Sequence, residues 1–202
     1  MVVNILKKPV VFCLSFIAVC LGACSGLTQS DKPAVISWWL VPYTNVAESE
    51  PPDPVSSVLV SVAVVPGLDT DRILALSENS VLKPYSSARW VENLPELTTS
   101  LVSRTLQASG RFEVVSERAR ASYNRCDLQL ELREFFASLG ASGQTRSVHI
   151  ALNGSYQCES EALIPVRLKA SVPVSDGRMK DIVAAFQQAL DRVMQDLLVE
   201  LS

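Results

Sequence analysis

Histidine is nearly absent from this chain of 202 residues, and several motifs that accompany catalysis are missing from it. The one histidine, His149, has no cysteine or carboxylate at the spacing that a metal site needs. The sequence also lacks a Gly-rich phosphate loop, a nucleophile elbow and a zinc-binding pattern. Asp69 and Asp71 follow a Pro-Gly pair, where aspartates commonly form turn hydrogen bonds, and no third ligand accompanies them. We therefore expect a protein with no catalytic activity, no cofactor and no metal.

An excess of positive charge is also lacking. The chain has 18 Lys and Arg against 21 Asp and Glu. Two of the lysines lie in residues 1–23, so a chain without that segment carries a net charge of 16 − 21 = −5. An acidic protein has no basic surface for nucleic acid or for anionic lipid head groups, so we exclude nucleic acid as a partner.

Residues 1–23 have the pattern of a lipoprotein signal peptide. The pair Lys7-Lys8 precedes an uncharged apolar run, 9–21, that is shorter than the ~20 residues of a membrane span. The run ends in Leu-Gly-Ala-Cys, a lipobox whose cysteine is Cys24. We predict cleavage before Cys24 and acylation of this residue, so that N-terminal acyl chains hold the protein in a membrane. The alternatives are an ordinary signal peptide and an uncleaved anchor.

The mature chain of 202 − 23 = 179 residues is long enough for one domain with a proper core. We expect residues 24–34 to be a lipidated tether and residues 35–202 to form the domain. Ser25 directly follows Cys24. In enterobacterial-type sorting, aspartate at this position retains a lipoprotein in the inner membrane, so serine favours an outer-membrane location facing the periplasm.

The run 35–41 predicts a first strand that contains Trp38 and Trp39. Because successive side chains of a strand point to opposite faces, one ring is expected in the core and the other in solvent or against a partner. We favour an edge strand with one ring half covered over a binding surface.

The region from Val58 to Val115 predicts a strand, hairpin, helix, strand unit. Valines alternate over 58–65 before Pro66-Gly67 ends the strand. Asn93 and Glu96 have the spacing of a capping box at the start of the helix, and Gly110 ends it. The remaining elements of this unit are a hairpin of 73–76 with 81–85 and a strand at 112–115.

Two runs with strict alternation, 126–136 and 148–158, predict half-buried strands joined as a hairpin. Folding about Ser142 pairs residues whose numbers sum to 284, which places Cys126 opposite Cys158 and Phe136 opposite Val148. Two other cysteines leave with the signal peptide and Cys24 is acylated, so two remain, in an oxidising compartment. We predict a disulfide between them, and the alternative is two buried free thiols.

A third alternating strand, 164–172, extends this hairpin into a three-stranded meander. The chain then ends in an amphipathic helix whose apolar residues run from Ile182 to Leu201. Helices interleaved with strands predict an α/β fold. We expect a single-domain sandwich with a mixed β-sheet, the C-terminal meander and two main packed helices.

Several short blocks of the sequence resemble the signature of the ABC-type transport auxiliary lipoprotein family. They occur in the family's order and comprise 65–73, Tyr85, 88–90, 94–97 and 109–112. The family consists of periplasmic lipoproteins that accompany MCE-domain lipid transporters. The resemblance implies a non-catalytic subunit that binds the MCE-domain protein and docks or stabilises an intermembrane lipid conduit, and it leaves homo-oligomer formation open.

The family blocks also suggest where the partner binds. The candidate residues of this surface are Asp69, Asp71, Arg72, Arg89, Trp90 and Glu96. Their structural alternatives are an ion pair between Arg89 and Glu96 and a Trp90 ring that caps the core. Two other functions stay open, namely a lipid-binding carrier module with an apolar cavity and an assembly lipoprotein for an outer-membrane barrel.

Overall fold

The computed structural model of the protein describes residues 34–45, 56–116, 125–159 and 161–201. The predicted signal peptide, Cys24 and most of the tether lie outside these residues. The described elements are β1 (Ile36–Trp38), β2 (Ser56–Val64), β3 (Arg72–Leu76), β4 (Leu82–Trp90), α2 (Leu94–Ala108), β5 (Phe112–Val115), β6 (Arg125–Leu139), β7 (Thr145–Cys158), β8 (Ile164–Pro173) and α3 (Met179–Glu200). They form the predicted α/β fold, a mixed eight-stranded sheet with two packed helices.

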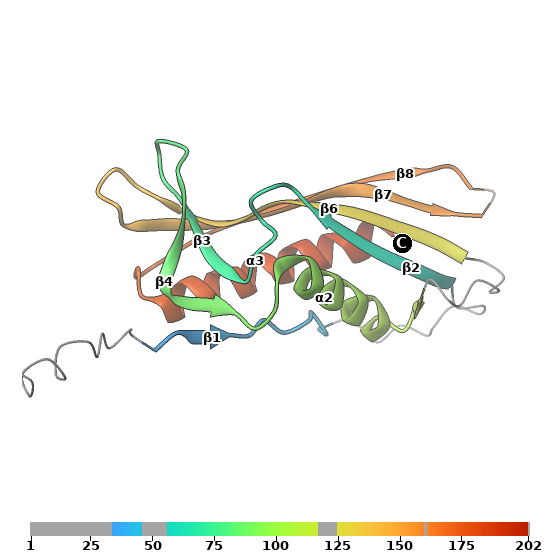
Figure 1. Cartoon of the computed structure of the whole chain (residues 1–202). Helices are drawn as coiled ribbons and strands as arrows, with labels where there is room; N and C mark the ends of the chain where they lie inside the picture. The colour runs from blue at the N-terminus through green and yellow to red at the C-terminus, as the bar shows by residue number, and fades with distance from the viewer. Residues whose placement is uncertain (1–33, 46–55, 117–124, 160, 202) are drawn as a thin grey trace, which may run out of the picture. The chain divides into compact units, whose positions relative to one another are not determined.

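Strand β6 organises the sheet because it pairs with strands on both of its edges (Figure 1). One edge carries the predicted antiparallel meander of β7 and β8. The other edge of β6 pairs with two strands, β2 and β3, one after the other along its length. Strand β2 runs parallel to the first half of β6, up to Val64 opposite Leu132, and β3 pairs in parallel with Ala137 and Ser138. The loop between β2 and β3 therefore connects two successive sites on one strand edge.

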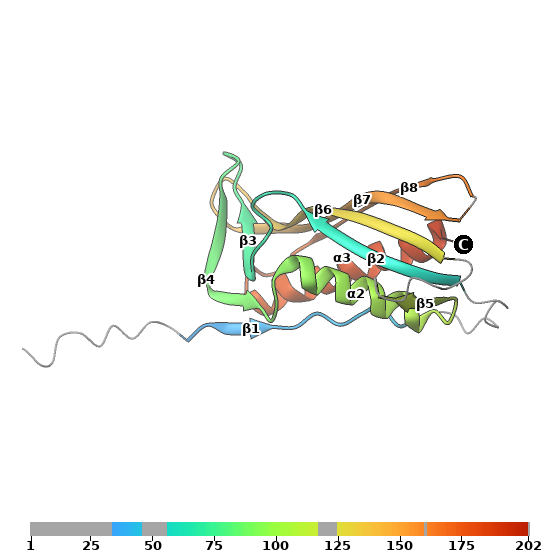
Figure 2. The same ribbon diagram turned by 45° about the vertical axis from the view of Figure 1, so that its right-hand side comes forward.

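Both helices pack on one face of the sheet, as Figures 1 and 2 show. Helix α3 lies against β7 and β8, while α2 lies against β2 and β5. The apolar stripe predicted for the last helix is buried from Ile182 to Leu201. Because these side chains recur at helical spacing, one face of α3 fills the space above the meander.

The predicted β6–β7 register is right at one end and wrong at the other. Cys126 lies opposite Cys158 and Leu132 opposite Leu152, as expected. A β-bulge between Leu132 and Glu134 then adds one residue to β6 and shifts the pairs from Glu134 to Ser138 by one, until a second irregularity before Leu139. Phe136 consequently lies opposite His149 rather than Val148.

The same bulge decides which phenylalanine enters the core. Phe135 is buried at 2% exposure, and its ring stacks on Phe186 of α3 with centroids 5.0 Å apart. Trp90, at 0% exposure, meets both rings edge-on, at 5.7 Å from Phe135 and 5.1 Å from Phe186. This three-ring cluster joins β4, β6 and α3, and such pairs contribute about 0.5 to 1.5 kcal/mol each beyond burial.

Helix α2 begins at the predicted place with different capping. Asn93 occupies the N-cap position, but its side chain makes no cap hydrogen bond, so the predicted capping box with Glu96 is wrong. The backbone supplies part of the missing cap, because the Leu94 N–H donates to the carbonyl of Thr70 at 3.1 Å. The loop before β3 thus fixes the start of α2.

The segment from β1 to Tyr43 is held against helix α3 by one glutamine. The Gln187 side chain accepts from the Val41 N–H at 2.9 Å and donates to the Val41 carbonyl at 3.0 Å. Leu40, which precedes Val41 in the chain, is 1% exposed. A side-chain amide with both a donor and an acceptor can replace a neighbouring strand in this way.

We expect Gln187→Ala to loosen this segment locally. Loss of both hydrogen bonds should lower the free energy of opening at Val41 by about 1 to 2 kcal/mol, which makes amide exchange roughly five- to thirtyfold faster. Hydrogen exchange of the 35–43 peptide measures it, with Gln188→Ala on the exposed side of α3 as the matched control. Equal exchange in both variants would contradict the role of Gln187.

Candidate partner-binding surface

Three of the predicted surface residues form one charged cluster. Asp71 lies between two arginines, with an oxygen 3.6 Å from Arg89 Nη1 and another 3.8 Å from Arg72 Nε. Strands β3 and β4 bring the arginines together, because Arg72 is paired with Arg89 across the antiparallel ladder. The side chain of Arg72 is 50% exposed and that of Arg89 46%, so about half of each is open to solvent.

The Pro-Gly loop positions Asp71 through its backbone. The Asp71 carbonyl accepts from the Trp90 N–H at 2.7 Å, and the Thr70 hydroxyl accepts from the Arg72 N–H at 3.2 Å. Leu68 anchors the loop at 3% exposure. A buried anchor and fixed backbone bonds make this a rigid support for exposed charges.

The other candidates separate into exposed and buried residues. Asp69 in the loop and Glu96 in the first turn of α2 are exposed. Arg89 pairs with Asp71, so the alternative of an Arg89–Glu96 ion pair is wrong. Trp90 is fully buried and cannot meet a partner, which corrects its place on the candidate surface. The alternative given for Trp90 from the sequence, a ring that caps the core, agrees with this burial.

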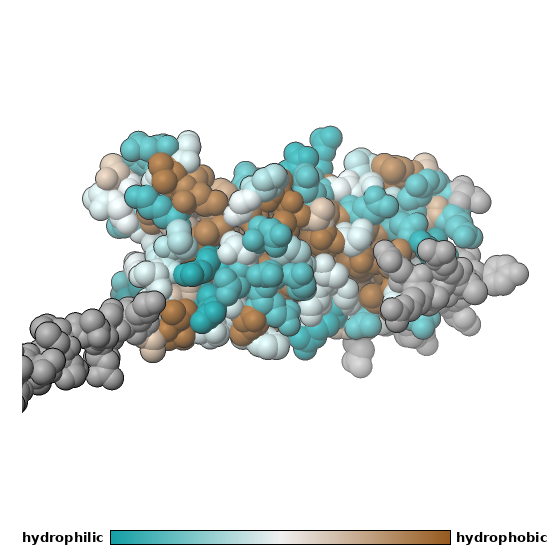
Figure 3. All heavy atoms as spheres, in the orientation of Figure 1, coloured by the Kyte–Doolittle hydropathy of each residue, from teal (hydrophilic) through white to brown (hydrophobic). Residues whose placement is uncertain are grey.

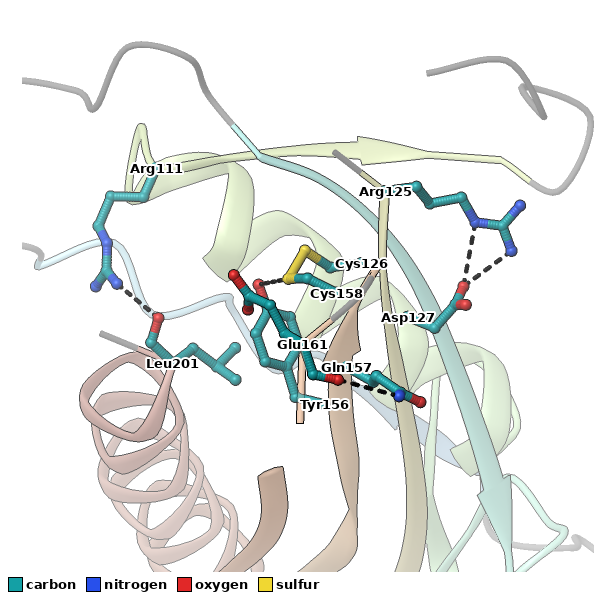
Figure 4. Close-up of a disulfide and its surroundings, with 9 residues drawn as sticks. All are labelled: Arg111, Arg125, Cys126, Asp127, Tyr156, Gln157, Cys158, Glu161 and Leu201. Carbon is teal, nitrogen blue, oxygen red and sulfur yellow. Dashed lines mark hydrogen bonds and ion pairs between the residues drawn. A yellow bond between two sulfur atoms is a disulfide. The ribbon is translucent and has the colours of Figure 1, made fainter. Parts of the chain in front are cut away.

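The structure contains the predicted Cys126–Cys158 disulfide, which closes the open end of the β6–β7 hairpin (Figure 4). The Tyr156 hydroxyl contacts Cys158 Sγ at 3.2 Å. Burial raises the pKa of Tyr156, with the charge of Glu161 acting in the same direction. The phenol therefore stays protonated and can donate to the sulfur.

Sequence reasoning missed a second contact at this end of the molecule, one made by Arg111. Arg111, between α2 and β5, donates to the carbonyls of Leu198 at 3.1 Å and Leu201 at 2.8 Å. These are carbonyls of the last turn of α3, where a cation suits the helix dipole. Figure 4 shows Arg111 reaching the helix end. The sequence around Arg111 does not indicate this contact, because the acceptors are backbone carbonyls 87 and 90 residues away.

The outer face of the meander is polar and shallow. Its two depressions are open, with volumes of about 440 and 400 Å³, and share Glu131, Asn153 and Gly154 as lining residues. Further along, His149 Nε2 lies 2.9 Å from the Ser147 hydroxyl and 3.2 Å from that of Ser138. Burial lowers the pKa of His149, so the ring is neutral at neutral pH.

Within the described residues, no group of three metal-ligating side chains comes together. No helix in the part of the chain that the structure describes is long and apolar enough to cross a membrane.

Solved structures define the class of fold. A protein from Xanthomonas campestris assigned to the family model DUF330 has a TM-score of 0.62 at 20% identity, over 82% of this chain and 90% of that one. An uncharacterised protein has a TM-score of 0.64 at 12% identity, over 83% and 100%. A hypothetical protein from Chlamydia trachomatis follows with a TM-score of 0.50 at 11% identity, over 73% and 95%. No curated protein matches the chain.

The family model described as "ABC-type transport auxiliary lipoprotein component" matches residues 41–197. The chain belongs to this family, of which the DUF330 proteins are members. The match covers all described elements from β2 to β8 and most of α3, so it includes the charged cluster and the disulfide.

Proposed function

We propose that this protein is a non-catalytic lipoprotein subunit that binds the MCE-domain component of an ABC lipid-transport system and docks or stabilises its conduit. Family membership supports the transport role. The observation that carries the docking site is the exposed cluster of Asp71, Arg72 and Arg89, held on a rigid support. Acyl chains on Cys24 anchor the protein in the outer membrane, with the domain facing the periplasm.

The cluster suits recognition of a protein surface. Exposed arginines offer several donors in a planar fork, which matches carboxylates of a partner, and arginine is enriched at interface hot spots. Asp71 keeps both side chains oriented without neutralising both, because it is one carboxylate between two cations. The neighbouring Asp69 and Glu96 add acidic groups that can select the register of a partner with mixed charges.

Docking is favoured over carrying a lipid. A carrier needs an apolar cavity of several hundred Å³ that encloses acyl chains. The two depressions described above are open to solvent rather than enclosed, and charged or amide side chains such as Gln129 and Arg133 take part in their lining. On the opposite face, the space between the sheet and α3 is filled by the aromatic cluster and the apolar stripe of the helix.

Reversing the charge of both arginines should weaken partner binding. We expect Arg72→Glu with Arg89→Glu to reduce recovery of the MCE-domain protein at least tenfold, because hot-spot losses of about 2 kcal/mol are common. The measurement is quantitative mass spectrometry after affinity purification of the tagged lipoprotein from envelope in mild detergent.

Arg104→Glu is the matched control, since Arg104 is an exposed arginine of α2 away from β3 and β4. Circular dichroism melts should stay within a few degrees for both variants, because exposed ion pairs contribute about 0 to 1 kcal/mol. Undiminished recovery with the double variant would remove the cluster from the interface.

A further inference from the structure

An exposed apolar patch lies where the chain enters the domain. It consists of Val35, Trp39 and Val41 around β1 together with Val91 after β4, and we call it the β1 patch. Trp39 is 59% exposed, Val41 52% and Val35 40%. Figure 3 shows apolar surface in the region of β1. Single exposed apolar residues are ordinary, whereas a group around one edge strand indicates a binding surface.

Strand geometry produces the patch. Leu40 is buried and Trp38 half-buried on the inner side, so the odd-numbered residues Trp39 and Val41 face outward. The Val91 N–H donates to the Trp38 carbonyl at 3.1 Å, which sets Val91 beside Trp39 on the outer side. Strand β1 is the last strand at its edge of the sheet, so no further described strand covers it.

The length of chain before the patch suggests what covers it. Ala34 is only 34 − 24 = 10 residues further along the chain than Cys24, and ten residues span at most about 36 Å when fully extended. Acyl chains on Cys24 therefore keep the β1 patch within that distance of the bilayer. Of the apolar residues exposed on the described surface, the patch contains those nearest in sequence to the lipid anchor.

We propose that the β1 patch rests on the lipid bilayer, with the Trp39 ring in the interfacial region. This inference depends on the acylation of Cys24 that the proposed function includes. A tryptophan ring suits the headgroup level because it is apolar with one polar edge. The patch then acts as a second membrane contact beside the acyl chains, and it fixes which side of the domain faces the membrane.

The charges beside the patch predict how this contact depends on salt. Arg89 and Glu92 flank Val91 in sequence, and Arg72 and Asp71 lie with Arg89 in the charged cluster, so these two cations and two anions sum to zero. Electrostatic attraction to anionic lipid is thus small, and apolar burial remains. Membrane contact of Trp39 is therefore expected to persist when the salt concentration is raised.

The test is tryptophan fluorescence of the acylated full-length mature protein in phosphatidylethanolamine and phosphatidylglycerol vesicles that contain brominated phospholipid. Trp90 is fully buried and Trp38 half-buried, so Trp39 is the ring available to lipid. We expect brominated chains to quench wild-type emission, most of this quenching to vanish in Trp39→Phe, and raised salt to leave it unchanged.

A reporter elsewhere supplies the control. Val199 is 69% exposed near the end of α3, 199 − 187 = 12 residues beyond the contact of Gln187 with the β1 segment, or about 18 Å along the helix. Val199→Trp in the Trp39→Phe background should restore emission without restoring quenching. Vesicle-bound wild-type protein whose emission brominated lipid leaves unchanged would overturn the proposal and indicate a protein partner for the patch. The proposed MCE binding is tested separately by co-purification.

Discussion

Replacing Cys126 and Cys158 together by serine is expected to lower the free energy of unfolding by about 3 to 4 kcal/mol. The disulfide links residues 32 apart in sequence and lies where β6 begins and β7 ends. Without it, the unfolded chain gains the freedom that the cross-link removes. The folded hairpin also loses the covalent closure of its open end. Cys126 is paired there with Val58 of β2, which in turn is paired with Val114 of β5.

Urea denaturation and calorimetry measure this effect. The melting temperature should fall by roughly 6 to 16 °C, at about 2 to 4 °C per kcal/mol for a domain of this size. Wild-type protein reduced with dithiothreitol is the matched control and should melt close to the double variant. Unchanged stability in the variant, or two alkylatable thiols in the unreduced wild-type protein, would contradict the structural role of the bridge.

Truncating Trp90 to alanine is expected to cost about 3 to 5 kcal/mol. The ring is fully buried and touches Phe135 of β6 and Phe186 of α3, so its removal leaves a cavity where three elements meet. Its Nε1 has no hydrogen-bond partner among the described residues, so the loss is one of packing. The adjacent loop should loosen too, because the Trp90 backbone holds Asp71.

Trp90→Phe is the matched comparison, because it shortens the side chain but keeps an aromatic ring at this position. It keeps an aromatic contact with both phenylalanines and removes no hydrogen bond, so we expect a distinctly smaller loss than for alanine. Denaturant unfolding of both variants gives the comparison. If Trp90→Ala unfolded at the wild-type denaturant concentration, the ring would not belong to the core.

The strands and helices were largely predictable because their burial is periodic. Alternation over 126–132 and 152–158 fixed the register of the hairpin at its cysteine end, and the stripe of α3 fixed its buried face. The order of the strands was not predictable. Strand β6 receives β2 and β3 on the same edge through contacts distant in sequence, and local patterns carry no information on such pairings.

The bulge in β6 shows a second limit. Phe135 and Phe136 are adjacent and chemically identical, so the alternating pattern assigned the core position to the wrong one. One inserted residue reverses inward and outward sides beyond it, and the tertiary packing against Trp90 and Phe186 selects the register.

The candidate surface was partly predictable. The family resemblance directed attention to Asp71, Arg72 and Arg89, which the fold brings together from a loop and two strands. It also included Trp90, because a sequence block does not separate residues that bind from residues that support the fold. The outward position of Trp39 followed from strand alternation once Trp38 was placed inward, and neither the family blocks nor composition indicated it.

The measurement that tests the central claim most directly is affinity purification of the tagged, acylated protein from native envelope in mild detergent, with mass spectrometry of the proteins recovered. We expect recovery of an MCE-domain protein, with or without its permease and ATPase, and loss of that protein with the Arg72→Glu, Arg89→Glu variant. Recovery of an outer-membrane barrel in its place, or of phospholipid alone, would contradict the docking function.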